Sequence, residues 1–262
     1  MIDIPIDQIL CGDCGEVMQT FPDECIDLIV TSPPYDNLRD YIVGYSFDVR
    51  KVAIELFRIT KIGGVVVWVV GDAVIDGSET GTSFSHALYF KKIGFNLHDT
   101  MIYQKPNFSN PSNNRYHQTF EYMFVFSKGP PKTFNPIKDR VNKYSQCFGK
   151  NTARLKSGEM VDRDKNTIGP MGMRHNVWLM NTVGQENVCK AMPHPAMFPE
   201  RLANDHILSW SNPGDLVLDP MCGSGTTCKM AKLNGRNYIG IDVSEEYCKL
   251  AESRIIKRVI PV

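Results

Sequence analysis

Apolar residues along this chain fall into short runs that alternate with stretches of helical spacing. Residues 25–30 and 65–70 form two largely apolar runs, which are typical of strands buried on both faces. Between them, apolar side chains recur at helical spacing over residues 48–60. We expect Gly63 and Gly64 to end that helix before the second strand begins. The pattern therefore predicts a helix followed by a strand, the repeating unit of an α/β fold.

The same alternation continues on both sides of a long polar stretch. Before it, the pattern predicts a helix over residues 82–93 and strands over 96–103 and 122–127. After it, Pro199 opens a helix that runs to Trp210, and Ser244 caps the last helix. Between these two helices we expect a strand over 216–219, a helix over 226–234 and a strand over 238–242. Sequential units of this kind predict a doubly wound, mostly parallel α/β sheet covered by helices on both faces.

Residues 129–190 break the alternation and are rich in proline and polar side chains. The whole chain has a formal net charge of zero, but residues 105–190 hold 14 Lys and Arg against 6 Asp and Glu. A basic insertion on a near-neutral chain is the charge distribution expected where a protein contacts phosphates, and an ordinary solvated insertion is the alternative. We therefore divide the chain into residues 1–128, a recognition insertion over 129–190, and residues 191–262. The Asn- and Pro-rich residues 105–118 are an alternative start for the insertion.

Two short motifs follow predicted strands near opposite ends of the chain. Residues 31–35 read Thr-Ser-Pro-Pro-Tyr, and the two prolines make a rigid corner because both of their φ angles are fixed. Residues 219–227 read Asp-Pro-Met-Cys-Gly-Ser-Gly-Thr-Thr, a glycine-rich turn before a predicted helix. Taken alone, the first motif could be an exposed turn. Because ligands collect at the carboxyl ends of strands in open α/β sheets, we expect the two motifs to form one site.

In this order the motifs resemble those of the β-class, circularly permuted DNA amino-methyltransferases, the N4-cytosine and N6-adenine family that uses S-adenosylmethionine. Further segments match that class, namely residues 12–13, 63–70, 121–128 and 194–202. The resemblance implies a seven-stranded Rossmann-like sheet with a basic recognition insertion, S-adenosyl-L-methionine as the cofactor, and DNA as the substrate. It leaves open whether the enzyme forms a homodimer and whether a cognate restriction endonuclease accompanies it.

The resemblance assigns the reacting base to the first motif. An exocyclic amine is a poor nucleophile. Groups that accept hydrogen bonds from the amine favour the pyramidal nitrogen of the transition state. Ser32 and the carbonyl of Pro33 are the implied acceptors, in a corner that Pro34 stiffens. Tyr35 would stack on a base flipped out of the duplex. Within the family, serine at the first position is associated more often with N4-cytosine enzymes, so we favour cytosine and keep adenine N6 as the alternative.

The second motif is implied to hold the cofactor. Glycines let the backbone approach a ligand closely, and the N–H groups that open the following helix can bind a carboxylate. Asp242 comes 23 residues after Asp219, close to the offset at which an acid binds ribose hydroxyls in dinucleotide folds, and the loop by itself does not exclude NAD. Asp13 is also implied near the cofactor, although it could instead cap a helix over residues 16–21. The candidate cofactor residues are Asp13, Thr31, Asp219, Pro220, Cys222, Gly223, Gly225, Thr226, Thr227 and Asp242.

Cysteine spacing and hydropathy narrow the picture further. Cys11 and Cys14 form the only Cys-x-x-Cys, with no second pair to complete four ligands, so we assign no metal. No apolar run approaches the roughly 20 residues that span a bilayer, and no secretory segment is evident, so we expect a cytoplasmic protein with no membrane association.

Two other functions stay open at this point. A nucleic-acid-binding relative could keep the fold and lack the chemistry. A methyltransferase for RNA or for a protein glutamine could use a similar Pro-Pro-Tyr element, although those enzymes place the cofactor loop first. The sequence predicts a site-specific DNA methyltransferase that acts on an exocyclic amine.

Overall fold

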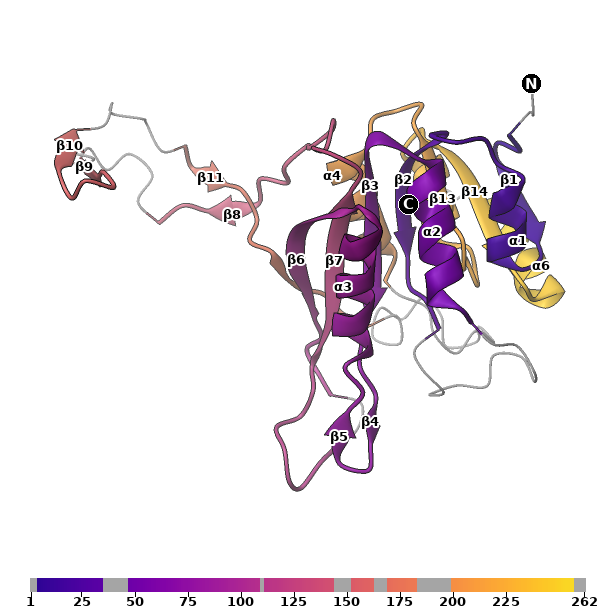
Figure 1. Cartoon of the computed structure of the whole chain (residues 1–262), viewed down its shortest axis with the longest axis horizontal. Helices are drawn as coiled ribbons and strands as arrows, with labels where there is room; N and C mark the ends of the chain where they lie inside the picture. Colours follow the sequence, from indigo (N-terminus) through magenta and orange to yellow (C-terminus); the bar gives the residue numbers. More distant parts are fainter. Residues whose placement is uncertain are drawn as a thin grey trace, which may run out of the picture. The chain divides into compact units, whose positions relative to one another are not determined.

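The computed structural model describes residues 4–34, 47–108, 111–143, 152–162, 169–182 and 199–256. The chain divides into two compact units, a first unit of Met1–Asn135 with Asn176–Val262 and a second unit of Pro136–His175. The first unit is an eight-stranded sheet between two layers of helices (Figure 1). Tyr35 and residues 194–198, which the sequence analysis singled out, lie outside the described residues.

The helices agree closely with the hydrophobic pattern. In the described part of the chain they are α1 (Cys14–Gln19), α2 (Val49–Ile59), α3 (Thr82–Ile93), α4 (Glu200–Trp210), α5 (Thr226–Leu233) and α6 (Glu245–Ile256). Pro199 is the N-cap of α4, and the Ser244 hydroxyl accepts the Tyr247 N–H at 3.3 Å, which confirms the predicted cap of α6. Within the same described residues, no helix combines the length and the apolar character that crossing a membrane requires.

The sheet of the first unit runs in the order β1-β14-β13-β2-β3-β7-β6-β12. All neighbouring pairs are parallel except those of β7, which is antiparallel to both β3 and β6. The predicted mostly parallel sheet is therefore confirmed. Its strands are β1 (Gln8–Cys11), β2 (Ile26–Thr31), β3 (Thr60–Val70), β6 (Asn96–Gln104), β7 (Phe120–Ser127), β12 (Val177–Leu179), β13 (Leu216–Asp219) and β14 (Asn237–Asp242).

The sheet has one strand more than the seven that we expected. The additional strand, β12, lies within residues 129–190 and pairs in parallel with β6, so that Trp178 stands opposite Tyr103. β12 is three residues long, and only its central Trp178 is buried. A pattern this short is not distinguishable from a loop in the sequence, because periodicity needs more positions to appear.

Gly63 and Gly64 lie inside β3, so the prediction that they end the preceding helix is wrong. Thr60 is already extended when the helix ends. A Cβ on Gly64 would lie 2.9 Å from the carbonyl oxygen of Lys61 and 3.0 Å from that of Asp27. The register of β2 against β3 shifts in this region. The glycines therefore accommodate an irregularity in the strand, where backbones approach closely.

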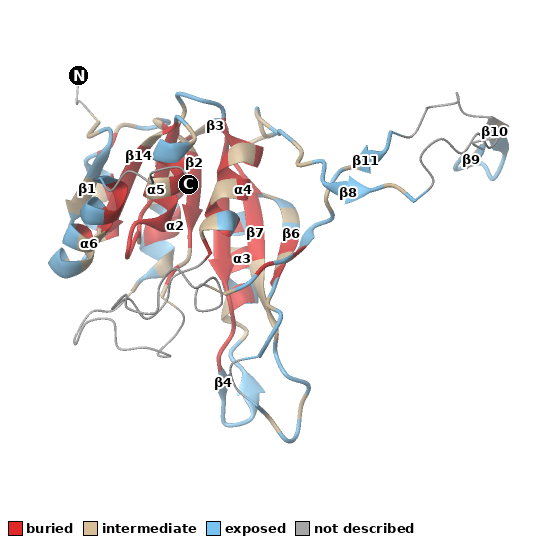
Figure 2. Cartoon of the chain, turned by 180° about the vertical axis from the view of Figure 1, so that it is seen from behind, coloured by how far each residue is buried: buried red, intermediate tan, exposed pale blue. Residues whose placement is uncertain are grey.

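Apolar side chains fill both faces of the sheet. One cluster contains residues 65, 67 and 69 of β3 together with Leu202 and Ile207 of α4. The other contains residues 66, 68 and 70 of β3 together with Leu56 of α2 and Phe90 of α3. Figure 2 shows the central strands as buried between the helices. Because both faces carry a helix layer, the doubly wound fold is confirmed.

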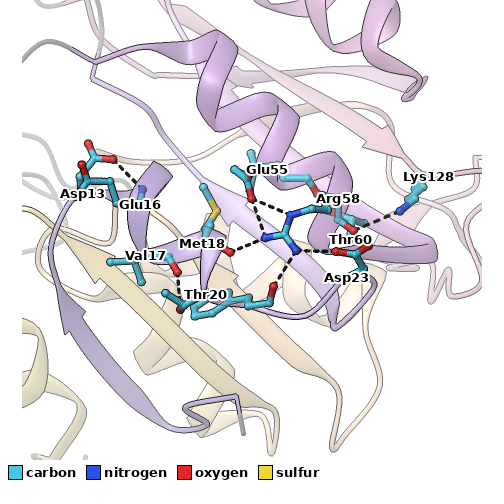
Figure 3. A network of polar contacts seen from close by, with 12 residues as sticks. Asp13, Glu16, Val17, Met18, Thr20, Asp23, Glu55, Arg58, Thr60 and Lys128 are labelled. Atoms are coloured by element: carbon cyan, nitrogen blue, oxygen red, sulfur yellow. Dashed lines mark hydrogen bonds and ion pairs between the residues drawn. The ribbon is translucent and has the colours of Figure 1, made fainter. Parts of the chain in front are cut away.

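A polar network fastens α1 to α2 (Figure 3). The Arg58 guanidinium donates to the carbonyl oxygens of Met18 and Phe21, each at 2.7 Å. It also donates to the carboxylates of Glu55 and Asp23, at distances of 2.7 to 2.9 Å. Carbonyl groups at a helix end need partners outside the helix. Arg58 supplies them and so fixes the segment that leads from α1 into β2.

The short strands outside the main sheet form three antiparallel pairs among the described residues. In the first unit, β4 (Val74–Ile75) and β5 (Ser78–Glu79) form a hairpin. In the second unit, β8 (Arg140–Val141) pairs with β11 (Met171–Gly172), and β9 (Thr152–Arg154) pairs with β10 (Met160–Asp162). The second unit is also held by Arg174, whose guanidinium donates to the Asp139 carboxylate at 2.5 and 2.8 Å.

Candidate active site

The sheet brings the two predicted motifs together at its carboxyl edge. β2 and β13 are parallel neighbours, with Leu28 opposite Val217, and each strand ends where its motif begins. The Thr31 hydroxyl donates to Asp219 Oδ1 at 2.7 Å, a buried hydrogen bond between residues 188 positions apart. The prediction that these two distant stretches meet is therefore confirmed for Thr31 and Asp219.

The Ser-Pro-Pro corner follows β2 directly. Pro33 is buried, and Ser32 and Pro34 are half-buried. The corner therefore begins one residue after the bond between Thr31 and Asp219, at the edge where the cofactor loop, residues 219–227, also begins. Tyr35 lies outside the described residues. The catalytic roles of Ser32, Pro33, Pro34 and Tyr35 stay predictions.

Asp219 organises the start of the cofactor loop from a buried position. Its side chain accepts hydrogen bonds from the Thr31 hydroxyl and from the Met221 N–H at 3.2 Å, and it also contacts the Thr227 hydroxyl. Burial raises the pKa of this carboxyl to about 6, against the opposing effect of its hydrogen bonds. Because all three partners belong to the protein, Asp219 holds β2, the loop and α5 in one arrangement.

The glycines of the cofactor loop occupy conformations that other residues rarely adopt. Gly223 and Gly225 have φ angles of 48° and 77°, in the left-handed region. A Cβ on Gly225 would lie 2.7 Å from the Ala251 Cβ on α6. Position 225 therefore requires glycine for two reasons, the left-handed backbone conformation and the close approach of α6. Pro220 is buried in the turn that opens the loop.

Arg254 supports the cofactor loop from α6. Its guanidinium donates to the carbonyl oxygen and the hydroxyl of Ser224, both at 2.6 Å, and to the Thr226 hydroxyl at 3.3 Å. It also contacts Glu200 Oε1 at 3.0 Å, an oxygen that accepts from Lys229 at 2.7 Å. The sequence analysis missed Arg254. The available signal was its helical spacing from the buried Cys248 and Ala251, which places a cation on the buried face of α6.

Asp242 ends β14 beside the loop. Its Oδ2 accepts the Gly223 N–H and its Oδ1 accepts the Ser244 N–H, each at 2.9 Å. The residue is half-buried, and burial raises the pKa of its carboxyl, while hydrogen bonds from these N–H groups act to lower it. The Val243 N–H also bonds to this carboxylate, which has about four acceptor positions, so capacity is left for a ribose hydroxyl.

These residues fit S-adenosylmethionine. Asp242 has acceptor capacity for a ribose hydroxyl. Gly225 is the N-cap of α5 and has no side chain to cap the first N–H groups of the helix, which suits a carboxylate ligand. The hydroxyl of Thr226 accepts from Arg254 and that of Thr227 donates to Val30 O at 3.1 Å. Thr226 and Thr227 would therefore serve the cofactor through their backbone. Direct contact of any of these residues with the cofactor stays a prediction.

Asp13 and Cys222 have structural roles, and for Asp13 this role is the alternative that the sequence analysis had kept. Asp13 is the N-cap of α1, and its side chain accepts the Glu16 N–H at 3.0 Å. The Cys222 thiol is buried and hydrogen-bonded to the Cys228 thiol, and a Cβ on Gly240 would come within 3.0 Å of both sulfur atoms. Cys222 therefore packs inside the fold. Within the described residues, no group of three or more His, Cys, Asp or Glu side chains gathers as a metal site would require.

Comparisons with known proteins extend over almost the whole chain. Residues 26–253 match the N6_N4_Mtase family, described as DNA methylase. The orphan methyltransferase M.BamHII of Bacillus amyloliquefaciens is 56% identical over 240 residues, which cover 90% of each chain. A protein of Thermus thermophilus, solved in complex with S-adenosyl-L-methionine, shares the fold with a TM-score of 0.65 and 24% identity over 97% of each chain.

A second solved structure, the PvuII DNA methyltransferase, has a TM-score of 0.67 and 21% identity, over 97% of this chain and 87% of its own. The family match covers both motifs and the strands that carry them, and the identity to M.BamHII extends over nine-tenths of the sequence. The chain therefore belongs to the N6_N4_Mtase family of DNA methylases, the S-adenosylmethionine-dependent DNA methyltransferases that its two motifs resemble.

Proposed function

We propose that the enzyme transfers the methyl group of S-adenosylmethionine to the N4 amine of cytosine in DNA. The observation that carries this proposal is the buried bond between Thr31 and Asp219, which sets the Ser-Pro-Pro corner beside the cofactor loop. Two facts support cytosine over adenine. Ser32 occupies the first position of the motif, and the PvuII enzyme, which shares this fold, is cytosine-N4-specific.

The proposed mechanism assigns positioning and polarisation to the corner after β2. The Ser32 hydroxyl oxygen and the Pro33 carbonyl oxygen accept hydrogen bonds from the two amine hydrogens, which localises the nitrogen lone pair for attack. Once the nitrogen has formed its bond to the methyl carbon, it releases one of these protons to solvent. Pro33 and Pro34 fix the backbone of the corner, so these acceptors need little reorganisation during the reaction. When bound, S-adenosylmethionine supplies the activated methyl group. Tyr35 stacks on the everted base and holds its amine at the corner.

We assign target recognition to the second unit. Residues 136–175 carry 9 Lys and Arg against 4 Asp and Glu. Lys138, Lys143, Arg154 and Lys156 are exposed, and exposed cations of this kind bind phosphates. A homodimer, a cognate restriction endonuclease and a cytoplasmic location stay predictions.

The test is to express the enzyme in a host that lacks DNA methylation and to analyse the nucleosides of its DNA by chromatography and mass spectrometry. We expect N4-methylcytosine, with a vector-only culture as the control. N6-methyladenine would overturn the choice of base and leave the amine chemistry intact. Unmodified DNA from a host that produces folded protein able to bind S-adenosylmethionine would overturn the proposed activity.

A further inference from the structure

Two segments of the first unit extend together beyond the carboxyl edge of the sheet. The β4–β5 hairpin follows β3, and residues 111–119 lie between β6 and β7. Since β3 and β6 are both antiparallel to β7, they run in the same direction as β2 and end at the same edge (Figure 1). The Arg115 guanidinium donates to the carbonyl oxygen of Gly77 in the hairpin and joins the two segments. We call residues 74–79 with 111–119 the finger.

The finger has a shape fixed by its own contacts. The rings of Phe108 and His117 stack with their centroids 3.9 Å apart. The Ser112 N–H donates to His117 Nδ1 at 3.3 Å, and the Ser112 hydroxyl donates to Asn114 Oδ1 at 2.9 Å. At the base, the Lys105 N–H donates to the Thr119 carbonyl at 2.6 Å. Long connections that are ordered in this way are usually functional.

Tyr116 is the most exposed large apolar residue in the part of the chain that the structure describes, at 100%. Its neighbour His117 is engaged with Phe108, whereas Tyr116 stands entirely in solvent. Both faces of this ring are therefore open to a partner that stacks on an aromatic side chain.

The chemistry around Tyr116 favours DNA as that partner. Residues 105–119 contain no Asp or Glu, and five of them carry amide side chains, which can bind base edges and phosphates. The acidic residues of the finger, Asp76 and Glu79, are confined to the hairpin. The connection that bears Tyr116 therefore contributes no negative charge of its own that would repel phosphates.

We propose that the finger is a second DNA-contacting element, separate from the second unit, and that Tyr116 stacks in the place that the everted base leaves in the duplex. This proposal rests on the proposed function, because a vacancy in the duplex arises only when a base is flipped out. An inserted side chain that restores stacking favours the open state of the duplex over the closed state. Tyr116 is then a positioning residue that acts on the DNA opposite the reaction centre.

The experiment compares two duplexes that carry the methylation site found by sequencing the modified DNA. In one, the target base is normally paired, and in the other it lies opposite an abasic site, which reduces the cost of flipping. We expect Tyr116→Ala to lower kcat/KM on the paired duplex by about tenfold or more and on the abasic duplex by less than about threefold. Tyr116→Phe retains the ring, so it should stay close to wild type, and affinity for S-adenosylmethionine should not change.

Leu233→Ala is the matched control, because this side chain is 56% exposed and lies at the end of α5 away from the cofactor loop. Equal activity of Tyr116→Ala and Leu233→Ala on the paired duplex would overturn the proposal, as would an equal loss on both duplexes. A change in oligomeric mass in Tyr116→Ala that accounts for lost activity would assign the finger to a second copy of the chain and also overturn it.

Failure of the proposed function has a different signature. In that case the wild-type protein itself would methylate neither duplex, and the finger would be judged by DNA affinity alone. Weaker binding of the paired duplex by Tyr116→Ala than by Leu233→Ala would then support a DNA-contacting finger, and equal binding would overturn it.

Discussion

The cofactor loop and the second unit are stabilised in opposite ways. The loop is buried, and its polar atoms are bonded to side chains of β2, β14 and α6 that are distant in sequence. The second unit is held by short antiparallel pairs and local contacts such as that of Arg174 with Asp139, while Lys138, Lys143 and Lys156 are exposed. A site that orients a methyl donor needs fixed partners, whereas a surface that binds phosphates needs cations directed to solvent. Substitutions in the cofactor loop should therefore lower stability and cofactor affinity, whereas substitutions in the second unit should lower DNA affinity alone.

The largest effect is expected at Gly225. Gly225→Ala would place a Cβ 2.7 Å from the Ala251 Cβ and force a φ of 77° on a non-glycine residue. We expect a loss of about 3 kcal/mol in the free energy of unfolding, together with weaker binding of S-adenosylmethionine. Denaturant titration and calorimetry measure the two effects.

Gly235→Ala is the control for this substitution, since Gly235 has a φ of 72° and no atom lies within 4 Å of the position that its Cβ would take. Gly235→Ala should lower the free energy of unfolding by about 1 kcal/mol, because it adds only backbone strain, and it should leave cofactor affinity unchanged. Equal losses in the two variants would show that the contact with α6 does not shape the loop.

Arg254→Met should have the next largest effect. The substitution keeps an unbranched side chain but removes the donors to Ser224 and Thr226, so buried acceptors lose their partner. We expect a loss of about 2 kcal/mol in stability and about tenfold in affinity for S-adenosylmethionine, with a smaller effect on DNA affinity. Lys249→Met on the same helix is exposed and should match wild type in both measurements. Unchanged cofactor affinity in Arg254→Met would remove its role as a support of the loop.

Asp219 should make stability depend on pH in an identifiable direction. Burial raises the pKa of its carboxyl from an ordinary value of 3.8 to about 6, so the folded protein binds more protons between these values than the unfolded chain. The contribution of Asp219 to the free energy of unfolding therefore falls as the pH rises from about 4 to about 6, on the order of 2 kcal/mol in total.

Asp219→Asn keeps an oxygen that can accept from Thr31 and Met221, and it does not titrate. The difference in unfolding free energy between wild type and this variant, followed from pH 4 to pH 7 by denaturant titration, isolates the contribution of Asp219. A constant difference across that range would contradict a buried Asp219 carboxyl with a raised pKa.

The smallest effect on stability is expected in the second unit. Replacement of Lys138, Lys143 and Lys156 by serine should change the free energy of unfolding by less than about 0.5 kcal/mol per site. The same variant should bind DNA more weakly, and the slope of log affinity against log salt should become shallower by about one for each phosphate that is no longer bound. Replacement of Lys91 and Lys92, exposed near the end of α3, is the control and should leave the slope unchanged. An unchanged slope in the triple variant would remove the second unit from the DNA interface.

The sequence predicted the regular elements well where the pattern was long. α3 and β13 have the bounds that were expected, because each combines a clear hydrophobic pattern with an identifiable start or end. β12 was missed because three residues with one buried tryptophan carry no period. The glycines before residue 65 were misassigned because a glycine pair has the same appearance at a helix end and at a strand irregularity.

The candidate site was predictable in outline but not in its supports. Two motifs at the ends of parallel strands could be placed together from topology alone, and the bond between Thr31 and Asp219 agrees with that prediction. The contribution of Arg254 could not be derived, since its partners come from α4 and from the loop, and only tertiary packing sets their distances. The same holds for the finger, where Arg115 meets a hairpin 38 residues away.

The most direct test of the central claim, that the corner after β2 and the cofactor loop form one methylating site, is the single-turnover rate of Ser32→Ala with its affinity for S-adenosylmethionine. We predict that the rate falls by about 100-fold, because one acceptor of the amine is lost, while the affinity stays within about twofold of wild type. Ser32→Thr keeps a hydroxyl and should recover much of the rate. An unchanged rate in Ser32→Ala, or a loss explained entirely by weaker cofactor binding, would contradict this account.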